Sequence, residues 1–334
     1  MANRFPTQAV HAGEEKHKPY GSLTTPIVQT STFTFADTGE ILAFMRAKEA
    51  EESDLHHEYG RYSNPTQSAA EAKLAKLEGA ERGLLFGSGM SAITTIILTR
   101  LSAGDHLIMV SDCYHRTREF ALMFLARWGI ETSLVDIDRP EQLITAIQPN
   151  TRMIFAETPT NPYLRVMDLE KLVVIAKAHK ITTVVDSTFA TPINLQPLKL
   201  GVDLVIHSAS KYLGGHNDLL AGVVLGSHLF ISQIEYARGV MCGMSNPNEA
   251  YLLLRGLKTL DLRIRQQNKS GMAIAQFLEN HPAVRRVYYP GLESHPDYQI
   301  ARDHLDGFGG VVSFEIDGDF KETGDFIDRL RLPY

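Results

Sequence analysis

The sequence has only two cysteines, Cys113 and Cys242, and they lie far apart with no Cys-x-x-Cys spacing. This scarcity argues against a disulfide framework and against a cysteine-rich zinc site. No run of about 18 apolar residues is present, so no membrane-spanning helix is expected. The N-terminal stretch MANRFPTQAVHAGEE also lacks the apolar core of a signal peptide. We therefore expect no membrane contact and a cytoplasmic location.

A long basic run is also missing from the chain. Lys and Arg are interspersed with Asp and Glu, and the formal net charge is −6, so nucleic acid is not expected as a partner. The thirteen histidines include no His-Glu-x-x-His motif, and no metal site is predicted. The length of 334 residues indicates roughly two domains of an ordinary soluble protein.

From Asn64 onward, strand-like apolar runs alternate with segments whose apolar residues recur at helical spacing. The strand-like runs are GLLF, HLIMV, ETSLVD, RMIFAE, ITTVVD and VDLVIHS. Near-continuous apolar strands separated by helices are typical of a parallel sheet that is buried on both sides. The pattern therefore predicts an α/β fold with a mostly parallel central sheet and helices on both faces.

The pattern of polar and apolar residues divides the chain into three parts. Residues 1–60 are irregular and polar, residues 61–245 carry the alternating pattern, and residues 246–334 combine long amphipathic helices with short strands. We predict an N-terminal arm, a large ligand-binding domain and a smaller C-terminal α+β domain. The sequence stops at FIDRLRLPY, within an apparent helix-to-strand connection, so we expect the last domain to be incomplete.

Three kinds of chemical group follow the ends of predicted strands. Asp186 ends ITTVVD, Lys211 follows VDLVIHS in the stretch VIHSASKYLGGHNDLLAG, and the glycine turn GSGM follows GLLF. Open α/β sheets bind ligands beyond the carboxyl ends of their strands, so we expect these groups to meet. The free N–H groups where a helix follows the glycine turn favour a phosphate, and Ser208 and Ser210 add hydroxyl groups that can bind the same anion.

Pyridoxal phosphate needs all three of these groups. It takes a lysine for its Schiff base, a cradle for its phosphate, and a carboxylate that keeps its pyridine nitrogen protonated. A cofactor linked to Lys211 also explains how a lysine can be buried at the end of an apolar strand, because the linked amine is no longer a bare ammonium.

A dinucleotide site is the main alternative. Gly87, Gly89 and Ala92 match the fingerprint G-x-G-x-x-A, and Asp112 roughly satisfies the acidic position that an NAD-binding oxidoreductase needs on the next strand. That interpretation gives no role to the lysine, the acid and the two serines named above.

Five ordered motifs carry a resemblance to a known family. The segments EYGRYSNPT, GSGM, AETPTNP, VVDSTFATP and HSASKYLGGHNDLLAG resemble the Cys/Met-metabolism (transsulfuration) family of pyridoxal-phosphate enzymes. This family includes cystathionine γ-synthases, cystathionine β- and γ-lyases, methionine γ-lyases and homoserine sulfhydrylases. The resemblance covers essentially the whole chain, and segments such as DCYHRTREF and YYPGLESHP are most similar to plant-type cystathionine γ-synthases. It implies the fold type I, aminotransferase-like architecture of pyridoxal-phosphate-dependent transferases.

The resemblance also implies a cofactor site. Lys211 would carry the Schiff base, Asp186 would pair with the pyridine nitrogen, and Tyr114 would stack on the ring. The other cofactor-binding residues that it implies are Gly89 and Met90 through their main chain, Ser208 and Ser210 at the phosphate, Thr188 beside the ring, Asn161 near the cofactor oxygen, and Tyr59 and Arg61.

Tyr59 and Arg61 would reach the cofactor phosphate of a neighbouring subunit, with residues 1–60 as the contacting arm. The implied assembly is a homotetramer, a dimer of dimers with active sites at the dimer interface. Tyr59 and Asn161 would also contact the amino-acid substrate. Where many relatives have YGGT this chain has YHRT, and we hypothesise that Arg116 binds the distal anionic group of an activated homoserine. A solvated arginine at a helix start is the alternative.

The implied reaction is γ-replacement, in which an activated homoserine ester and cysteine give cystathionine for methionine biosynthesis. Lys211, once free, would act as the general base at Cα. Elimination by a cystathionine γ- or β-lyase or a methionine γ-lyase stays open, as does a non-catalytic protein that only binds the cofactor. Family members continue beyond LPY with a Ser/Gly/Glu stretch and a carboxylate-binding arginine, so we expect further chain beyond Tyr334.

Overall fold

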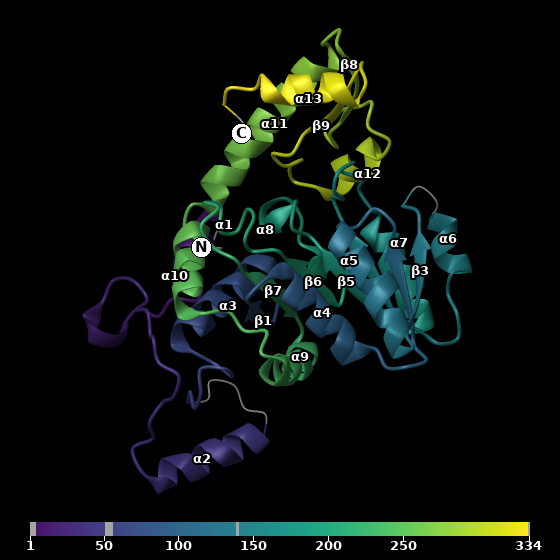
Figure 1. The fold of residues 1–334 in the computed structure, drawn as a ribbon. Coiled ribbons are helices and arrows are strands. Elements are labelled where there is room, and N and C mark those ends of the chain that lie inside the picture. The colour runs from purple at the N-terminus through teal and green to yellow at the C-terminus, as the bar shows by residue number, and fades with distance from the viewer. Residues whose placement is uncertain (1–4, 51–55, 138–139, 333–334) are drawn as a thin grey trace.

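A computed structural model of the chain describes residues 5–50, 56–137 and 140–332 (Figure 1). Residues 1–4 and 51–55 of the predicted arm therefore lie outside the described residues. The strands of the central sheet are β1 (Arg82–Phe86), β2 (His106–Val110), β3 (Glu131–Val135), β4 (Thr151–Glu157), β5 (Thr182–Asp186), β6 (Leu204–His207) and β7 (Gly222–Gly226). They are ordered β1-β7-β6-β5-β4-β2-β3, and β7 alone runs antiparallel to its two neighbours. The predicted mostly parallel sheet is confirmed.

β7 is a strand that the sequence pattern does not predict. Its segment GVVLG is short and has glycine at both ends, which is typical of a loop or turn. The structure gives a reason for the first of these glycines. A Cβ on Gly222 would lie 2.2 Å from the main-chain oxygen of Ser88, so only glycine lets β7 approach the turn after β1 this closely.

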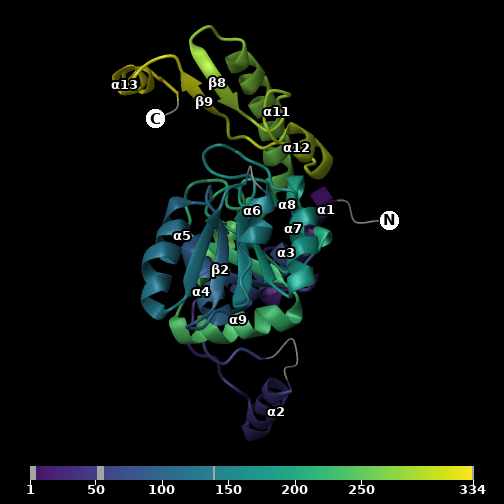
Figure 2. The ribbon, with the colours of Figure 1, turned by 90° about the vertical axis from the view of Figure 1, so that its right-hand side faces the viewer.

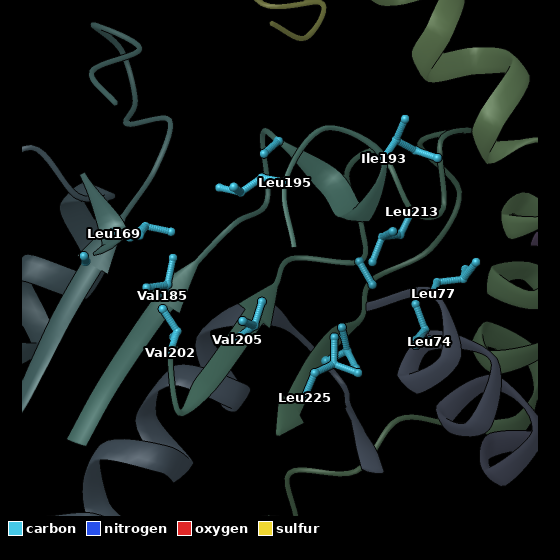
Figure 3. Close-up of a cluster of buried hydrophobic side chains, with 14 of the residues drawn as sticks. Leu74, Leu77, Leu169, Val185, Ile193, Leu195, Val202, Val205, Leu213 and Leu225 are labelled. Atoms are coloured by element: carbon cyan, nitrogen blue, oxygen red, sulfur yellow. The ribbon is translucent and has the colours of Figure 1, made fainter. Parts of the chain in front are cut away.

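Helices cover both faces of the sheet, as predicted (Figure 2). On one face lie α3 (Pro65–Glu78), α6 (Pro140–Thr145), α7 (Leu169–His179) and α10 (Pro247–Leu257), and on the other lie α4 (Gly89–Arg100), α5 (His115–Glu119) and α9 (His228–Met241). Successive strand residues serve the two cores alternately: Val205 packs into the first, whereas Leu204 and Ile206 pack into the second. Figure 3 shows the first core, in which Leu74 and Leu77 of α3 lie near Leu225 of β7.

The remaining elements lie around this layered body. They are α1 (Phe5–His11), α2 (Thr38–Glu49), α8 (Thr191–Asn194), α11 (Leu260–Glu279), α12 (Tyr298–His304), α13 (Phe320–Asp328), β8 (Val284–Tyr288), β9 (Ser313–Ile316), and short 3-10 or π-helical turns at Pro19–Gly21, Phe120–Leu125, Ala126–Trp128 and Pro197–Leu200. Figures 1 and 2 both show α2 apart from the sheet, on the side opposite to β8 and β9. No helix among the described residues is long and apolar enough to cross a membrane.

The C-terminal elements form a small unit above the sheet (Figure 1). β8 and β9 pair antiparallel, and Val287, Tyr289 and Leu292 form the centre of a third apolar core. A buried ion pair connects this unit to the loop after β4, because Arg165 donates to both carboxylate oxygens of Asp297 at 2.6 and 2.9 Å. The domain boundaries at residues 60 and 245 stay predictions.

Candidate active site

Asp186 is the last residue of β5, and its carboxylate is buried at the carboxyl edge of the sheet. The main-chain N–H of Thr188 donates to Asp186 Oδ1 at 3.0 Å, and the Thr188 hydroxyl donates to the same oxygen. Both bonds end on Oδ1, so neither uses the second carboxylate oxygen. Burial raises the pKa of Asp186, while the bonds from Thr188 lower it. A buried acid in this position favours a cationic partner.

Thr188 links this acid to the glycine turn after β1. Its hydroxyl oxygen accepts a hydrogen bond from the main-chain N–H of Ser208 at 2.8 Å. A Cβ on Gly89 would lie 3.2 Å from the Ser208 hydroxyl. The absence of a side chain on Gly89 therefore leaves the space between the glycine turn and Ser208 open. Ser88 caps α4 by accepting a bond from Ser91 N–H at 3.0 Å. The structure therefore places an acid, a hydroxyl group and the N-terminus of a helix side by side.

Lys211 lies four residues beyond the end of β6, in the turn that follows Ser208. Its main-chain N–H donates to the Ser208 oxygen at 3.0 Å. The Lys211 side chain is exposed in the single chain, whereas the sequence analysis expected a buried amine. Ser210 uses its hydroxyl to accept from Ala221 N–H at 2.9 Å. This bond fixes the turn against the chain that enters β7.

The structure reveals a second buried acid that the sequence analysis did not assign. Glu157 ends β4, and its Oε2 accepts a hydrogen bond from the main-chain N–H of Tyr114 at 2.7 Å. The main-chain N–H of Asn161 also donates to this carboxylate. Burial first, and then the charge of Asp186, raise the pKa of Glu157 well above its ordinary value. The available signal was its place at a strand end, the same signal that identified Asp186.

Three other predicted residues lie around this edge. The Tyr114 side chain is 38% exposed, which leaves much of its ring surface open. Met90 is in the first turn of α4, and its sulfur accepts a bond from the Thr117 hydroxyl at 3.6 Å. Arg116 is exposed and donates to Glu119 at 2.6 Å. Glu119 first, and the Tyr114 phenol to a lesser degree, raise the pKa of the Arg116 guanidinium.

Tyr59 and Arg61 make their contacts elsewhere. Arg61 donates to the main-chain oxygen of Gly239 at 2.7 Å, and its guanidinium lies 5.3 Å from the centre of the Tyr59 ring. Both residues line a cavity of about 340 Å³ together with Asn64 and Asn246. None of the contacts seen for them within the described residues joins them to Asp186, Ser208 or Lys211.

The sheet order argues against the dinucleotide alternative. That site needs the strand after the glycine turn and helix to lie next to the first strand, so that its acid can bind the ribose. Here β1 and β2 stand at the first and sixth positions of the sheet, with β7, β6, β5 and β4 between them. Asp112 follows β2, so it does not complete a nucleotide site at the Gly87–Gly89 turn.

The residues at this edge fit pyridoxal phosphate. The cradle of Gly89 and Gly222, where a Cβ would meet Ser208 or Ser88, lets main chain approach a phosphate closely. Asp186 supplies a buried carboxylate for a protonated pyridine nitrogen, and the exposed Lys211 supplies a reachable amine.

Comparison with known proteins identifies a family. Residues 6–334 match the model for Cys/Met metabolism PLP-dependent enzymes. The chain is 45% identical to cystathionine gamma-synthase 1, chloroplastic, of Nicotiana tabacum over 98% of its own length, and it spans 60% of that relative. It is 39% identical to cystathionine gamma-lyase of Bacillus subtilis, over 98% of this chain and 82% of the relative.

A solved structure agrees with these matches. The crystal structure of MetB from Corynebacterium glutamicum superposes on the chain with a TM-score of 0.92 at 35% sequence identity. The match covers 99% of this chain and 83% of the other. At this identity and coverage, the likeness extends to the whole chain rather than to the sheet alone.

Proposed function

The chain belongs to the Cys/Met metabolism family of PLP-dependent enzymes, and from this premise we propose that it catalyses γ-replacement, joining an activated homoserine ester and cysteine into cystathionine. The observation that carries the proposal is the meeting of Asp186, Ser208 and the Gly89 turn at one sheet edge, next to Lys211. The choice of a synthase is supported by the 45% identity to the tobacco synthase, which exceeds the 43% to L-methionine gamma-lyase of Fusobacterium nucleatum and the 39% to the Bacillus lyase.

Pyridoxal phosphate, when bound, draws electrons from the substrate's α-carbon into its pyridine ring. We propose that Asp186 holds the proton on the ring nitrogen and that Tyr114 covers the ring face. Ser208 and the main-chain N–H groups of Gly89 and Met90 hold the phosphate. Lys211 takes the proton from the substrate's Cα and then from Cβ. The bond from Cγ to the ester oxygen then breaks and the acid leaves. The cysteine thiol loses its proton as its sulfur bonds to Cγ, and Lys211, which gives up each proton before it takes the next, returns protons to Cβ and Cα to give cystathionine.

Turnover assays distinguish synthase from lyase. Purified protein is given cysteine with the phosphoryl, succinyl or acetyl ester of homoserine, and in parallel cystathionine alone. We expect cystathionine to form from at least one ester faster than cystathionine is cleaved. Cleavage of cystathionine without its synthesis would contradict the proposal and favour the γ- or β-lyase alternative. The 39% identity to a γ-lyase supports that alternative.

Arg116 is proposed to select the ester. Its pair with Glu119 is exposed, and such pairs are weak and screened by salt, so a substrate anion can replace the carboxylate. We expect Arg116→Ala to raise the KM for phosphoryl and succinyl esters by about tenfold, the effect of losing one charge-assisted bond. The KM for the uncharged acetyl ester serves as the control. An equal change for all three esters, or none, would show that Arg116 is only a solvated residue.

We also propose a homotetramer whose Tyr59 and Arg61 complete the neighbouring subunit's site. Support comes from their positions, since their contacts within the described residues leave them away from Lys211 and beside Gly239. Sedimentation equilibrium of the holoenzyme tests the assembly. A cytoplasmic location stays a prediction, and the tobacco relative is a chloroplastic protein.

A further inference from the structure

Two buried carboxyl groups lie side by side at the centre of the site. Glu157 and Asp186 are register partners at the ends of the parallel strands β4 and β5, and each residue is only 7% exposed. Register partners on neighbouring strands, about 4.8 Å apart, direct their side chains to the same face. Like charges in such a pair destabilise a sheet, and burial increases their cost. A proton on one acid, or a cation bound beside the pair, offsets this cost.

Glu157 also connects two loops that carry predicted cofactor residues. Its carboxylate accepts the main-chain N–H of Tyr114 at 2.7 Å, from the loop after β2. The main-chain N–H of Asn161, in the loop after β4, donates to the same group. Tyr114 and Asn161 are 47 residues apart in the sequence, so one side chain sets the positions of two separate loops relative to the sheet edge.

We propose that Glu157 is a positioning residue for the cofactor. It fixes the main chain of Tyr114 and Asn161, and when a cationic ring is bound to Asp186 it supplies a second negative charge beside that acid. That charge favours the protonated form of a pyridine ring bound to Asp186, and the cation in turn offsets the repulsion between the two acids. The inference rests on the family's dependence on pyridoxal phosphate, and it is independent of the choice between synthase and lyase.

The test compares Glu157→Gln with the unchanged protein. Apoprotein is titrated with pyridoxal phosphate, and the visible circular dichroism of the bound cofactor and the Tm of the apoprotein are recorded. We expect the affinity to fall about tenfold or more, the effect of losing hydrogen bonds to a charged group. The dichroism per bound cofactor should also change, because the neutral amide oxygen of glutamine holds the main chain of Tyr114 more weakly than a carboxylate does. The apoprotein Tm should change little, since the lost bonds are offset by the loss of repulsion with Asp186.

Asp203→Asn is the matched control. The Asp203 carboxylate accepts the main-chain N–H and the hydroxyl of Thr183, each at 2.8 Å, near the opposite end of β5. We expect this change to lower the apoprotein Tm and to leave the affinity and the dichroism of the bound cofactor unchanged. It thus reports the effect of losing a purely structural carboxylate that is bonded to the same strand, β5.

A second variant separates the effect of the carboxylate's charge from the effect of the side chain's length. Glu157→Asp keeps the charge but is one methylene shorter, so we expect altered dichroism with a smaller loss of affinity than in Glu157→Gln. The inference is overturned if Glu157→Gln retains the normal affinity and dichroism, if it fails to fold, or if its affinity falls only in proportion to its Tm. Failure of the unchanged protein to bind pyridoxal phosphate would instead remove the premise of the proposed function as well.

Discussion

Lys211→Ala is expected to abolish turnover and to release the cofactor on gel filtration. The variant loses both the amine that binds the aldehyde of pyridoxal phosphate and the base that takes the substrate's Cα proton. General acid–base groups contribute up to about 10⁴-fold to a rate, so we expect a loss of at least this size. The measurements are turnover with the preferred ester and the visible absorption of the filtered protein.

Because Lys211 is exposed, its replacement tests the chemistry of the amine with little effect on folding. The side chain is exposed, so its removal should shift the free energy of unfolding by less than about 0.5 kcal/mol. Lys269→Ala, at an exposed position in the middle of α11, is the control and should retain both turnover and absorption. A Lys211→Ala protein that kept its visible band would show that another amine holds the cofactor.

The order of strand-like and helical segments predicted the fold because each strand is an apolar run with a clear end. Asp186 and the turn before Lys211 follow such ends, so their meeting at one edge was predictable from the direction of parallel strands. The exposure of the Lys211 side chain was not predictable in this way. Lys211 is four residues past β6, where the shape of the turn, and not the apolar pattern, decides which way a side chain points.

The role of Glu157 depends on the order of strands in the sheet. Its bond to Tyr114 spans 43 residues and exists because β2 lies directly beside β4. Periodicity in the sequence identifies each strand but not its neighbours, so the residue was quoted within AETPTNP without a function. The short antiparallel β7 is a similar case. Its first glycine, Gly222, is required by the close approach to Ser88, a contact between segments far apart in the sequence.

Asp186→Asn is expected to lower turnover by about two orders of magnitude while the protein still folds. A hydrogen bond to a charged group contributes roughly 1.5–3 kcal/mol, which corresponds to about 10²-fold in rate when it acts in the transition state. Asparagine keeps the size of the side chain and can still accept the bonds from Thr188. It cannot hold a proton on the pyridine nitrogen, so the loss should be in kcat and not only in cofactor affinity.

The same variant predicts a change in how stability depends on pH. Burial raises the pKa of Asp186 above its ordinary value of 3.8, so the folded apoprotein binds this proton more tightly than the unfolded chain. Its contribution to stability is therefore present at low pH and is lost as the pH rises from 3.8 through the raised pKa. Relative to the unchanged apoprotein, Asp186→Asn should gain stability as the pH rises across this window.

Asp168 provides the control of opposite sign. Despite its partial burial, hydrogen bonds from Lys171 hold the pKa of Asp168 below 3.8, so its contribution to stability is lost as the pH falls through that lowered pKa. Asp168→Asn keeps a good cap for α7 and should leave turnover unchanged. Thermal unfolding of the two apoprotein variants at several pH values measures both slopes. A normal kcat in Asp186→Asn, or the same sign of slope in both variants, would mean that Asp186 is not the buried acid that the cofactor requires.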